Sequence, residues 1–231
     1  MTPVVRKVLI AVVALVVAVV GVPWVYINLV KDDAPEALTL EPTPTTIVST
    51  TTTIDATGPA LDGDWTVAEE SVVGYRVKEI LFGQSTEGVG RTNAVTGTLT
   101  IAAQQVTAAN FEVDMTTLAS DSDRRDRQVR GRILDTASFP TATFALGAPI
   151  PLTPEALAGG DLVVDAKGSL TLRGVTKDVT VPLVARLTDG VIEVSGSIQI
   201  VFAEWSIPDP SISAISVEDR GVLEFLIRFG R

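Results

Sequence analysis

Alternation of apolar and polar residues is the feature that most restricts the fold of this chain. Between residues 62 and 231, apolar side chains recur at every second position in several separate segments. Successive side chains of a β-strand point to opposite faces, so this pattern predicts half-buried strands with one face toward an apolar interior. The clearest cases are Phe111–Met115, Leu170–Leu172, Val181–Leu187, Val194–Phe202 and Leu223–Phe229.

Turns and short polar segments interrupt this alternation. Leu187–Val191 contains an Asp-Gly pair, which is typical of a hairpin turn, and Gly174–Asp178 indicates another turn between two strands. Ser120–Leu134 is highly charged and begins Ser-Asp-Ser, where the Asp or the second Ser would cap a short helix. A second short helix is expected in Thr153–Ala158, because Thr-Pro-Glu is a typical helix start.

These segments predict one all-β domain over residues 62–231 with a short helical insert. Strands at this spacing suit an antiparallel barrel or a sandwich, and periodicity alone leaves both open. A domain of this length is expected to enclose one sizeable core.

A long apolar run precedes this domain. Val8–Val30 contains no charged residue, and as a helix it would span ~34 Å, enough to cross a bilayer core. Arg6 and Lys7 precede the run, so the positive-inside rule puts the N-terminus in the cytoplasm and the rest outside. A cleaved signal peptide is the alternative, but no small-x-small cleavage site follows the run. We therefore expect residues 1–30 to be an uncleaved, single-pass anchor in the plasma membrane.

Residues 31–61 join the apolar run to the predicted β domain. They hold nine threonines and four prolines and show no periodic apolar face. Such a segment does not bury enough apolar surface to fold, so it is expected to be a disordered, extended tether.

Composition excludes several classes of function. The chain has no cysteine and no histidine, so it has neither disulfides nor a Ser-His-Asp triad. Its net charge of −10 disfavours binding to nucleic acid, which depends on a basic face. Asp121, Asp123 and Asp126 lack the spacing of a calcium loop, so no metal site and no cofactor are expected. No pair of carboxylates has a catalytic spacing, and an enzyme ranks last among the candidate functions.

Six short segments, taken in order, resemble the YceI-like family of extracytoplasmic proteins. The most specific match is the decapeptide Gly168–Lys177, and the resemblance covers the whole of residues 62–231. It implies a lipocalin-like antiparallel β-barrel whose lumen holds a long isoprenoid or a similar aliphatic chain; barrels of about eight strands hold one such ligand. The other five segments are Asp64–Val67, Ser71–Val77, Val95–Leu99, Ser122–Asp126 and Phe139–Phe144.

Two departures from the family concern polar contacts. Lys78 and Glu79 stand where family members often carry a histidine after the first strand. Near the end of the domain, Phe202–Ser206 keeps only the acid and the aromatic residue of the family pattern. The polar contacts that would orient a ligand head group are therefore in question, whereas the fold is not.

The apolar faces and the resemblance together define candidate residues for the lumen. An ordinary packed core is the alternative for each of them. The Arg124, Arg125 and Asp126 cluster leaves two interpretations, contact with an anionic lipid head group or a solvated helix face. The lumen candidates are Phe111, Val113, Phe144, Leu170, Leu172, Ile198, Ile200, Phe202, Trp205 and Phe225.

We thus expect a membrane-tethered, extracytoplasmic module that binds a polyisoprenoid or a similar long apolar chain and is not an enzyme. Its expected partners are that lipid and the membrane, and its oligomeric state is left open. The alternative is a structural or interaction barrel of the cell envelope that holds no lipid.

Overall fold

The structure is a computed structural model, and it describes residues 3–17, 21–25, 34–40, 61–81, 83–212 and 215–231. The strands are β1 (Gly63–Val67), β2 (Val72–Leu81), β3 (Gln84–Thr92), β4 (Val95–Ala102), β5 (Gln105–Asp114), β6 (Ala119–Ser120), β7 (Thr141–Leu146), β8 (Ile150–Pro151), β9 (Leu162–Leu172), β10 (Val175–Thr188), β11 (Val191–Val201), β12 (Ile215–Val217) and β13 (Arg220–Gly230). The helices are α1 (Pro3–Val16), α2 (Val22–Val25), α3 (Asp123–Gln128) and α4 (Pro154–Leu157), with short turns η3 (Met115–Thr117), η4 (Val129–Ile133) and η5 (Phe202–Trp205).

Eight antiparallel strands close into a barrel. They follow the order β1-β4-β5-β7-β9-β10-β11-β13, and β13 pairs back onto β1 through Val67 and Phe229. The expected all-β, antiparallel barrel with few short helices is therefore correct, and the sandwich that periodicity left open is not formed. Closure leaves this ring of strands without a free edge between β1 and β13.

The strand β13 pairs with both β1 and β2, and Ser71 joins the two pairings. Ser71 is fully buried between the end of β1 and the start of β2. Its hydroxyl accepts a hydrogen bond from Arg228 N at 2.9 Å and donates one to Arg228 O at 3.2 Å. The side chain thus replaces a missing strand partner and satisfies backbone groups that would otherwise be buried without one.

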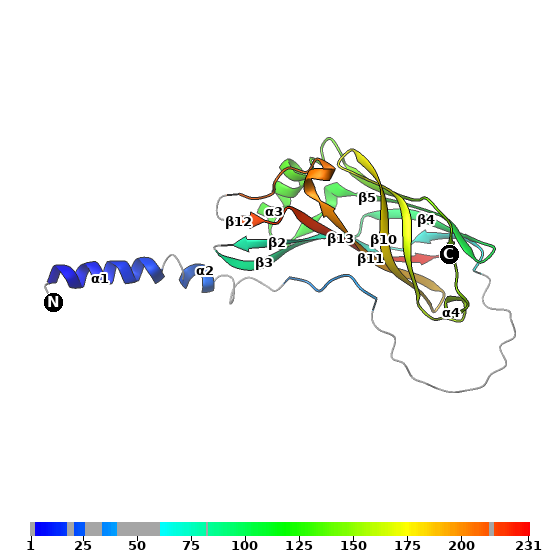
Figure 1. The fold of residues 1–231 in the computed structure, drawn as a ribbon, viewed down its shortest axis with the longest axis horizontal. Helices are drawn as coiled ribbons and strands as arrows, with labels where there is room; N and C mark the ends of the chain where they lie inside the picture. Colours follow the sequence, from blue (N-terminus) through cyan, green and yellow to red (C-terminus); the bar gives the residue numbers. More distant parts are fainter. Residues whose placement is uncertain (1–2, 18–20, 26–33, 41–60, 82, 213–214) are drawn as a thin grey trace, which may run out of the picture.

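The two ends of the barrel differ. Beyond Ser71, β2 and β3 form a hairpin that extends the wall, β12 pairs with β2, and β6 pairs with β3. Figure 1 shows this hairpin, β12 and α3 at one end of the barrel, and α4 with the C-terminus toward the other. We call these the α3 end and the α4 end.

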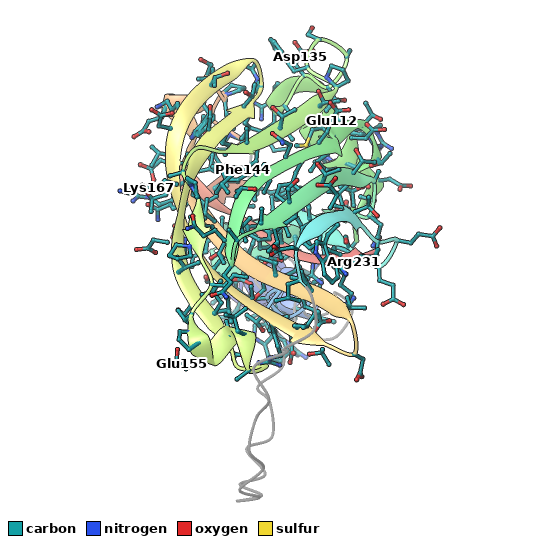
Figure 2. All side chains as sticks on the ribbon, turned by 90° about the vertical axis from the view of Figure 1, so that its right-hand side faces the viewer. Glu112, Asp135, Phe144, Glu155, Lys167 and Arg231 are labelled. Atoms are coloured by element: carbon teal, nitrogen blue, oxygen red, sulfur yellow. The ribbon has the colours of Figure 1, made fainter. Side chains whose placement is uncertain are left out.

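Apolar side chains of the alternating segments turn inward. Figure 2 shows Phe144 turned into the barrel, whereas Glu112 and Lys167 lie on its outside. The buried apolar residues form two clusters, and Met115 and Leu223 pack against both. The interior of the barrel is therefore mainly apolar.

The helices and turns follow local signals in the sequence. Both short helices occur where they were expected, α3 capped by Ser122 and α4 capped by Thr153. Asp189 and Gly190 form the predicted hairpin turn, with φ of 52° and 81°. The turn predicted over Gly174–Asp178 is wrong in extent: only Arg173 and Gly174 turn, and β10 begins at Val175. A hairpin of this type needs only two residues with positive φ.

At the N-terminus, the described residues of α1 and α2 do not form a helix that is long and apolar enough to cross a membrane. The expected span Val8–Val30 includes residues 18–20 and 26–30, which lie outside the described part of the chain. The membrane anchor therefore stays a prediction.

A short piece of the predicted tether, residues 34–40, contacts the outside of the barrel. Arg76 Nη2 donates to Pro35 O at 2.6 Å, and Arg91 donates to the carbonyl oxygen of Glu36. Leu40 N donates to the hydroxyl of Ser195 at 3.2 Å. This contact was not expected from the sequence. It is made by backbone groups of residues 34–40, and the side-chain pattern of a segment does not indicate which hydrogen bonds its backbone forms. Residues 31–33 and 41–60 of the tether lie outside the described part of the chain.

Candidate ligand-binding site

A cavity of about 380 Å³ lies inside the barrel. Its lining reaches from Leu61 and Ala156, at the α4 end, to Ile212 and Val217, at the α3 end. Pockets of roughly 300–1,000 Å³ with mostly apolar walls are typical of small-molecule sites. Nine of the ten residues predicted for the lumen line it: Phe111, Val113, Phe144, Leu170, Leu172, Ile198, Ile200, Phe202 and Phe225. That these side chains contact a lipid remains a prediction.

The tenth candidate, Trp205, is buried but is not among the described residues that line the cavity. It lies in η5, where the chain leaves the strand β11, and it packs in the core beside Ile207. Lys177 Nζ lies 5.7 Å from the centre of its ring. η5 is a 3₁₀ helix, which has three residues per turn, so positions i and i+3 share a face. Phe202 and Trp205 are therefore both buried, although their spacing breaks the strand period.

Aromatic rings in the lumen lie over glycines of neighbouring strands. A Cβ atom added to Gly168 on β9 would come within 2.4 Å of Phe144 Cζ, so the ring fills the space that a side chain would take. A ring placed in this way packs against the wall of the barrel and leaves the space nearer the axis open. The same arrangement recurs for Phe111 over Gly97, Phe225 over Gly196 and Tyr75 over Gly90.

Polar side chains reach the cavity near its α3 end. Glu79 lies on the same face of β2 as Val73, Tyr75 and Val77, and it is buried. Arg125 of α3 pairs with it, with Nη2 3.2 Å from Oε1, and also forms an ion pair with Asp121. The polar residues that line the cavity here are Tyr75, Glu79, Ser122, Arg124, Arg125 and Gln128.

Glycines of β3 make room for this polar group. A Cβ atom at Gly88 would overlap Glu79 Oε1, and one at Gly90 would lie 2.8 Å from the hydroxyl of Tyr75. Because these glycines are two residues apart on one face of a strand, the two polar groups lie about 7 Å apart along the wall. The polar side chains therefore form one cluster, which we call the polar end of the cavity.

The hydroxyl of Tyr75 is the least satisfied group of the polar end. It is buried and has no hydrogen-bond partner among the described residues. Burial is the largest influence on its pKa and raises it; Arg125 acts in the opposite direction, and Asp126, Glu79 and Asp121 raise it further. Tyr75 is therefore a neutral phenol that has a hydrogen-bond donor to offer inside an apolar cavity.

Sequence reasoning missed Tyr75 and Glu79, although a signal for both was present. Alternate residues of β2 lie on one face, and this face carries Val73, Tyr75, Val77 and Glu79. The alternation that places the valines inside the barrel therefore also places the two polar residues there. Arg125 was considered only as a head-group contact or as part of a solvated helix face. Its pairing with Glu79 depends on how α3 folds over the hairpin, which alternation does not reveal. Among the described residues, no group of three acidic residues is placed to hold a metal ion.

Comparison with known proteins identifies the family. The family model described as the YceI-like domain matches residues 65–229. UPF0312 proteins of Shewanella baltica and Shewanella putrefaciens are each 38% identical over 96 residues, which cover 40% of this chain and 47% of theirs. The chain thus spans about half the length of the curated relatives it matches.

Two solved structures share the fold at low sequence identity. A polyisoprenoid binding domain from Saccharophagus degradans, described as implicated in plant cell wall breakdown, has a TM-score of 0.56 at 20% identity, covering 72% of this chain and 97% of that one. BcnA of Burkholderia cenocepacia has a TM-score of 0.52 at 19% identity, covering 68% and 95%. With the family match over most of the barrel, the resemblance noted in the sequence is confirmed: the chain belongs to the YceI-like domain family.

Proposed function

We propose that the barrel binds a polyisoprenoid or a similar long apolar chain in its cavity and holds it as a carrier or reservoir. One observation carries this proposal: the interior of the barrel is an apolar cavity that opens along both core clusters instead of a filled core. The Saccharophagus degradans domain, described as polyisoprenoid-binding, has the same fold and supports the choice of ligand class.

The physical basis is burial of hydrocarbon. Each methylene group moved from water into an apolar site contributes about 0.8 kcal/mol, so a long chain gains affinity over its whole length. An apolar wall offers no directed contacts, and such a site therefore selects for length and thickness more than for chemical detail. A protein of this kind shields the chain from water and does not transform it.

We also propose that residues 1–30 anchor the barrel to the plasma membrane, with the N-terminus in the cytoplasm and the barrel outside. The uncharged run Val8–Val30 and the preceding Arg6 and Lys7 support this orientation. A tethered barrel would have direct access to lipids of the outer leaflet.

The test of lipid binding is the mass of the full-length chain. The chain is purified from membranes in detergent and analysed by native mass spectrometry, before and after incubation with geranylgeraniol. We expect one long-chain lipid per chain, retained through purification or taken up on incubation. A chain that keeps its ligand-free mass under both conditions would support the alternative, a structural or interaction barrel.

The test of the anchor is fractionation. The full-length chain should stay in the membrane fraction after a carbonate wash, and protease added from outside should release a fragment close to residues 62–231 by cutting in the Thr/Pro-rich segment. A mature soluble form that lacks residues 1–30 would contradict the anchor and would leave the lipid proposal untouched.

A further inference from the structure

The polar end of the cavity holds a hydrogen-bond donor that the described protein groups do not use. Tyr75 lies over Gly90 on the wall of the lumen, and its hydroxyl is buried without a partner among the described residues. A buried polar group without a partner is rare in folded proteins, and where one occurs it commonly marks a site completed by another molecule. The cavity in front of Tyr75 is where such a molecule would lie.

The charges around this hydroxyl determine which kind of group fits. Arg125 is the cation that acts on Tyr75, and three carboxylates act on it as well, those of Asp126, Glu79 and Asp121. Arg125 is already paired with Glu79 and Asp121. An anion placed beside Tyr75 would therefore approach the buried carboxylate of Glu79 while the charge of Arg125 is already compensated, and like charges repel strongly where the dielectric is low.

Asp126 is a further carboxylate near Tyr75 and is held in place. It is buried, and its Oδ1 accepts hydrogen bonds from Ser120 N at 2.9 Å and from the hydroxyl of Ser120 at 2.7 Å. Arg124 also lines the cavity, but it is exposed, so solvent screens its charge more than the charges of Arg125 and Glu79.

We propose that the polar end binds the head group of a neutral lipid through an acceptor oxygen, such as a carbonyl, that takes a hydrogen bond from Tyr75, and that it discriminates against a diphosphate. This inference rests on the proposed function, because it assigns the head group of the lipid whose chain occupies the apolar part. This site differs from the anionic head-group contact considered for the Arg124–Asp126 cluster, because Arg125 lines the cavity but is already paired with Glu79 and Asp121.

The test compares three isoprenoids on the delipidated full-length chain. Geranylgeranylacetone carries a neutral ketone, geranylgeranyl diphosphate carries an anionic head group, and phytane has no head group. Bound ligand is quantified by native mass spectrometry for the wild type, for Tyr75→Phe and for Tyr26→Phe, which removes the only other tyrosine hydroxyl.

For the wild type we expect the ketone to bind about tenfold more tightly than phytane, the usual effect of one hydrogen bond to a buried group, and the diphosphate to bind most weakly. Tyr75→Phe should reduce ketone binding to the level of phytane and leave phytane binding unchanged. Tyr26→Phe should bind all three as the wild type does.

Glu79→Gln removes one negative charge and should improve binding of the diphosphate relative to the ketone.

The outcomes separate the two proposals. If phytane and the ketone bind equally well, or if Tyr75→Phe does not weaken the ketone, the head-group site is wrong and the lipid-binding function stands. Preference of the wild type for the diphosphate would also overturn the site. Failure of all three ligands to bind would overturn the function and the head-group site with it.

Discussion

At the scale of single residues, Gly168 leaves room for the ring of Phe144, and the openness of the lumen depends on such pairs. Gly168→Ala places a methyl group 2.4 Å from Phe144 Cζ and 2.5 Å from the carbonyl oxygen of Ala145, so the ring must move toward the axis of the barrel and the neighbouring strand must also shift. We expect less bound lipid and a loss of about 1–3 kcal/mol in the free energy of unfolding, as is usual when a packed site receives an extra group. Both are measurable, by mass spectrometry and by urea denaturation.

Gly131→Ala is the matched control for this prediction. Apart from its chain neighbours and the backbone of its own helical turn, no atom of the described residues lies within 4 Å of a Cβ added there. The control should keep its lipid and be as stable as the wild type or up to about 1 kcal/mol more stable, because alanine is preferred over glycine in a helical turn. Equal lipid binding by Gly168→Ala and Gly131→Ala would refute the role of the ring and glycine pairs.

Tyr75 should remain protonated well above the ordinary tyrosine pKa of about 10. Burial raises its pKa in the folded state, so the unfolded chain releases this proton first as the pH rises. The unfolded state then binds fewer protons than the folded one, and stability falls as the pH rises above about 10. In a Tyr26→Phe background, Tyr75 is the only tyrosine, and tyrosinate absorbance should appear near pH 10 in urea but not in the folded chain. Appearance at the same pH in both states would contradict its burial.

The residues of the lumen show what alternation predicts and where it stops. Leu170, Ile198 and Phe225 follow from the period of two, because strand geometry alone fixes the face on which they lie. Trp205 does not, since the chain has left the strand by then. Glu79 was missed for another reason. A charged residue is expected to be exposed unless a partner for its charge is known, and the partner of Glu79 is Arg125, which comes from a distant segment.

At the scale of elements, β13 and β2 are joined on their outer face by an ion-pair cluster around Glu224. Glu224 is 2% exposed, and its carboxylate lies 3.3 Å from Arg76 Nε and 3.0 Å from Arg91 Nη2. Both arginines also donate to backbone carbonyls of residues 34–40. The cluster therefore links three segments: β13, the β2–β3 hairpin and the start of the predicted tether.

We expect Glu224→Gln to destabilise the barrel by about 2 kcal/mol, because it removes the carboxylate charge that pairs with both Arg91 and Arg76 and leaves Arg76 with its pair to Glu87. Hydrogen exchange of the Leu40 amide should also become faster as residues 34–40 lose their contact. Glu204→Gln is the control: Glu204 pairs with Lys177 at 3.0 Å, but its side chain is 58% exposed, and such pairs contribute about 0–1 kcal/mol. Equal effects of the two changes in urea denaturation would mean that the cluster is not a structural link.

The elements differ in how far the sequence predicts them. Long strands such as β9 and β13 are evident because many residues repeat the same alternation. The helices α3 and α4 are evident from their caps, which are local. The pairing of β13 with both β1 and β2 is not, because it depends on Ser71 replacing a backbone partner across a separation of more than 150 residues. Contacts of that range leave no trace in a local pattern.

At the scale of the whole molecule, the question is whether the barrel is hollow or filled. Sequence alone does not decide it, because a residue that lines a cavity and a residue in a packed core are both apolar and both inward. The difference lies in the summed volume of side chains against the space that the strands enclose. Rings lying over glycines shift this balance toward an open lumen.

The most direct test of a hollow, lipid-binding barrel compares Ile198→Asp with Gln199→Asp. Ile198 lines the cavity, and Gln199 is the exposed neighbour on the opposite face of β11. A carboxylate at position 198 must be desolvated against hydrocarbon when the lipid is bound, which costs several kcal/mol, whereas an empty cavity can admit water around it. Bound lipid per chain and circular dichroism are measured on both full-length variants. The account predicts a folded Ile198→Asp variant with strongly reduced lipid and a Gln199→Asp variant that binds as the wild type does; an unfolded Ile198→Asp beside a folded Gln199→Asp would contradict it and make the interior a packed core.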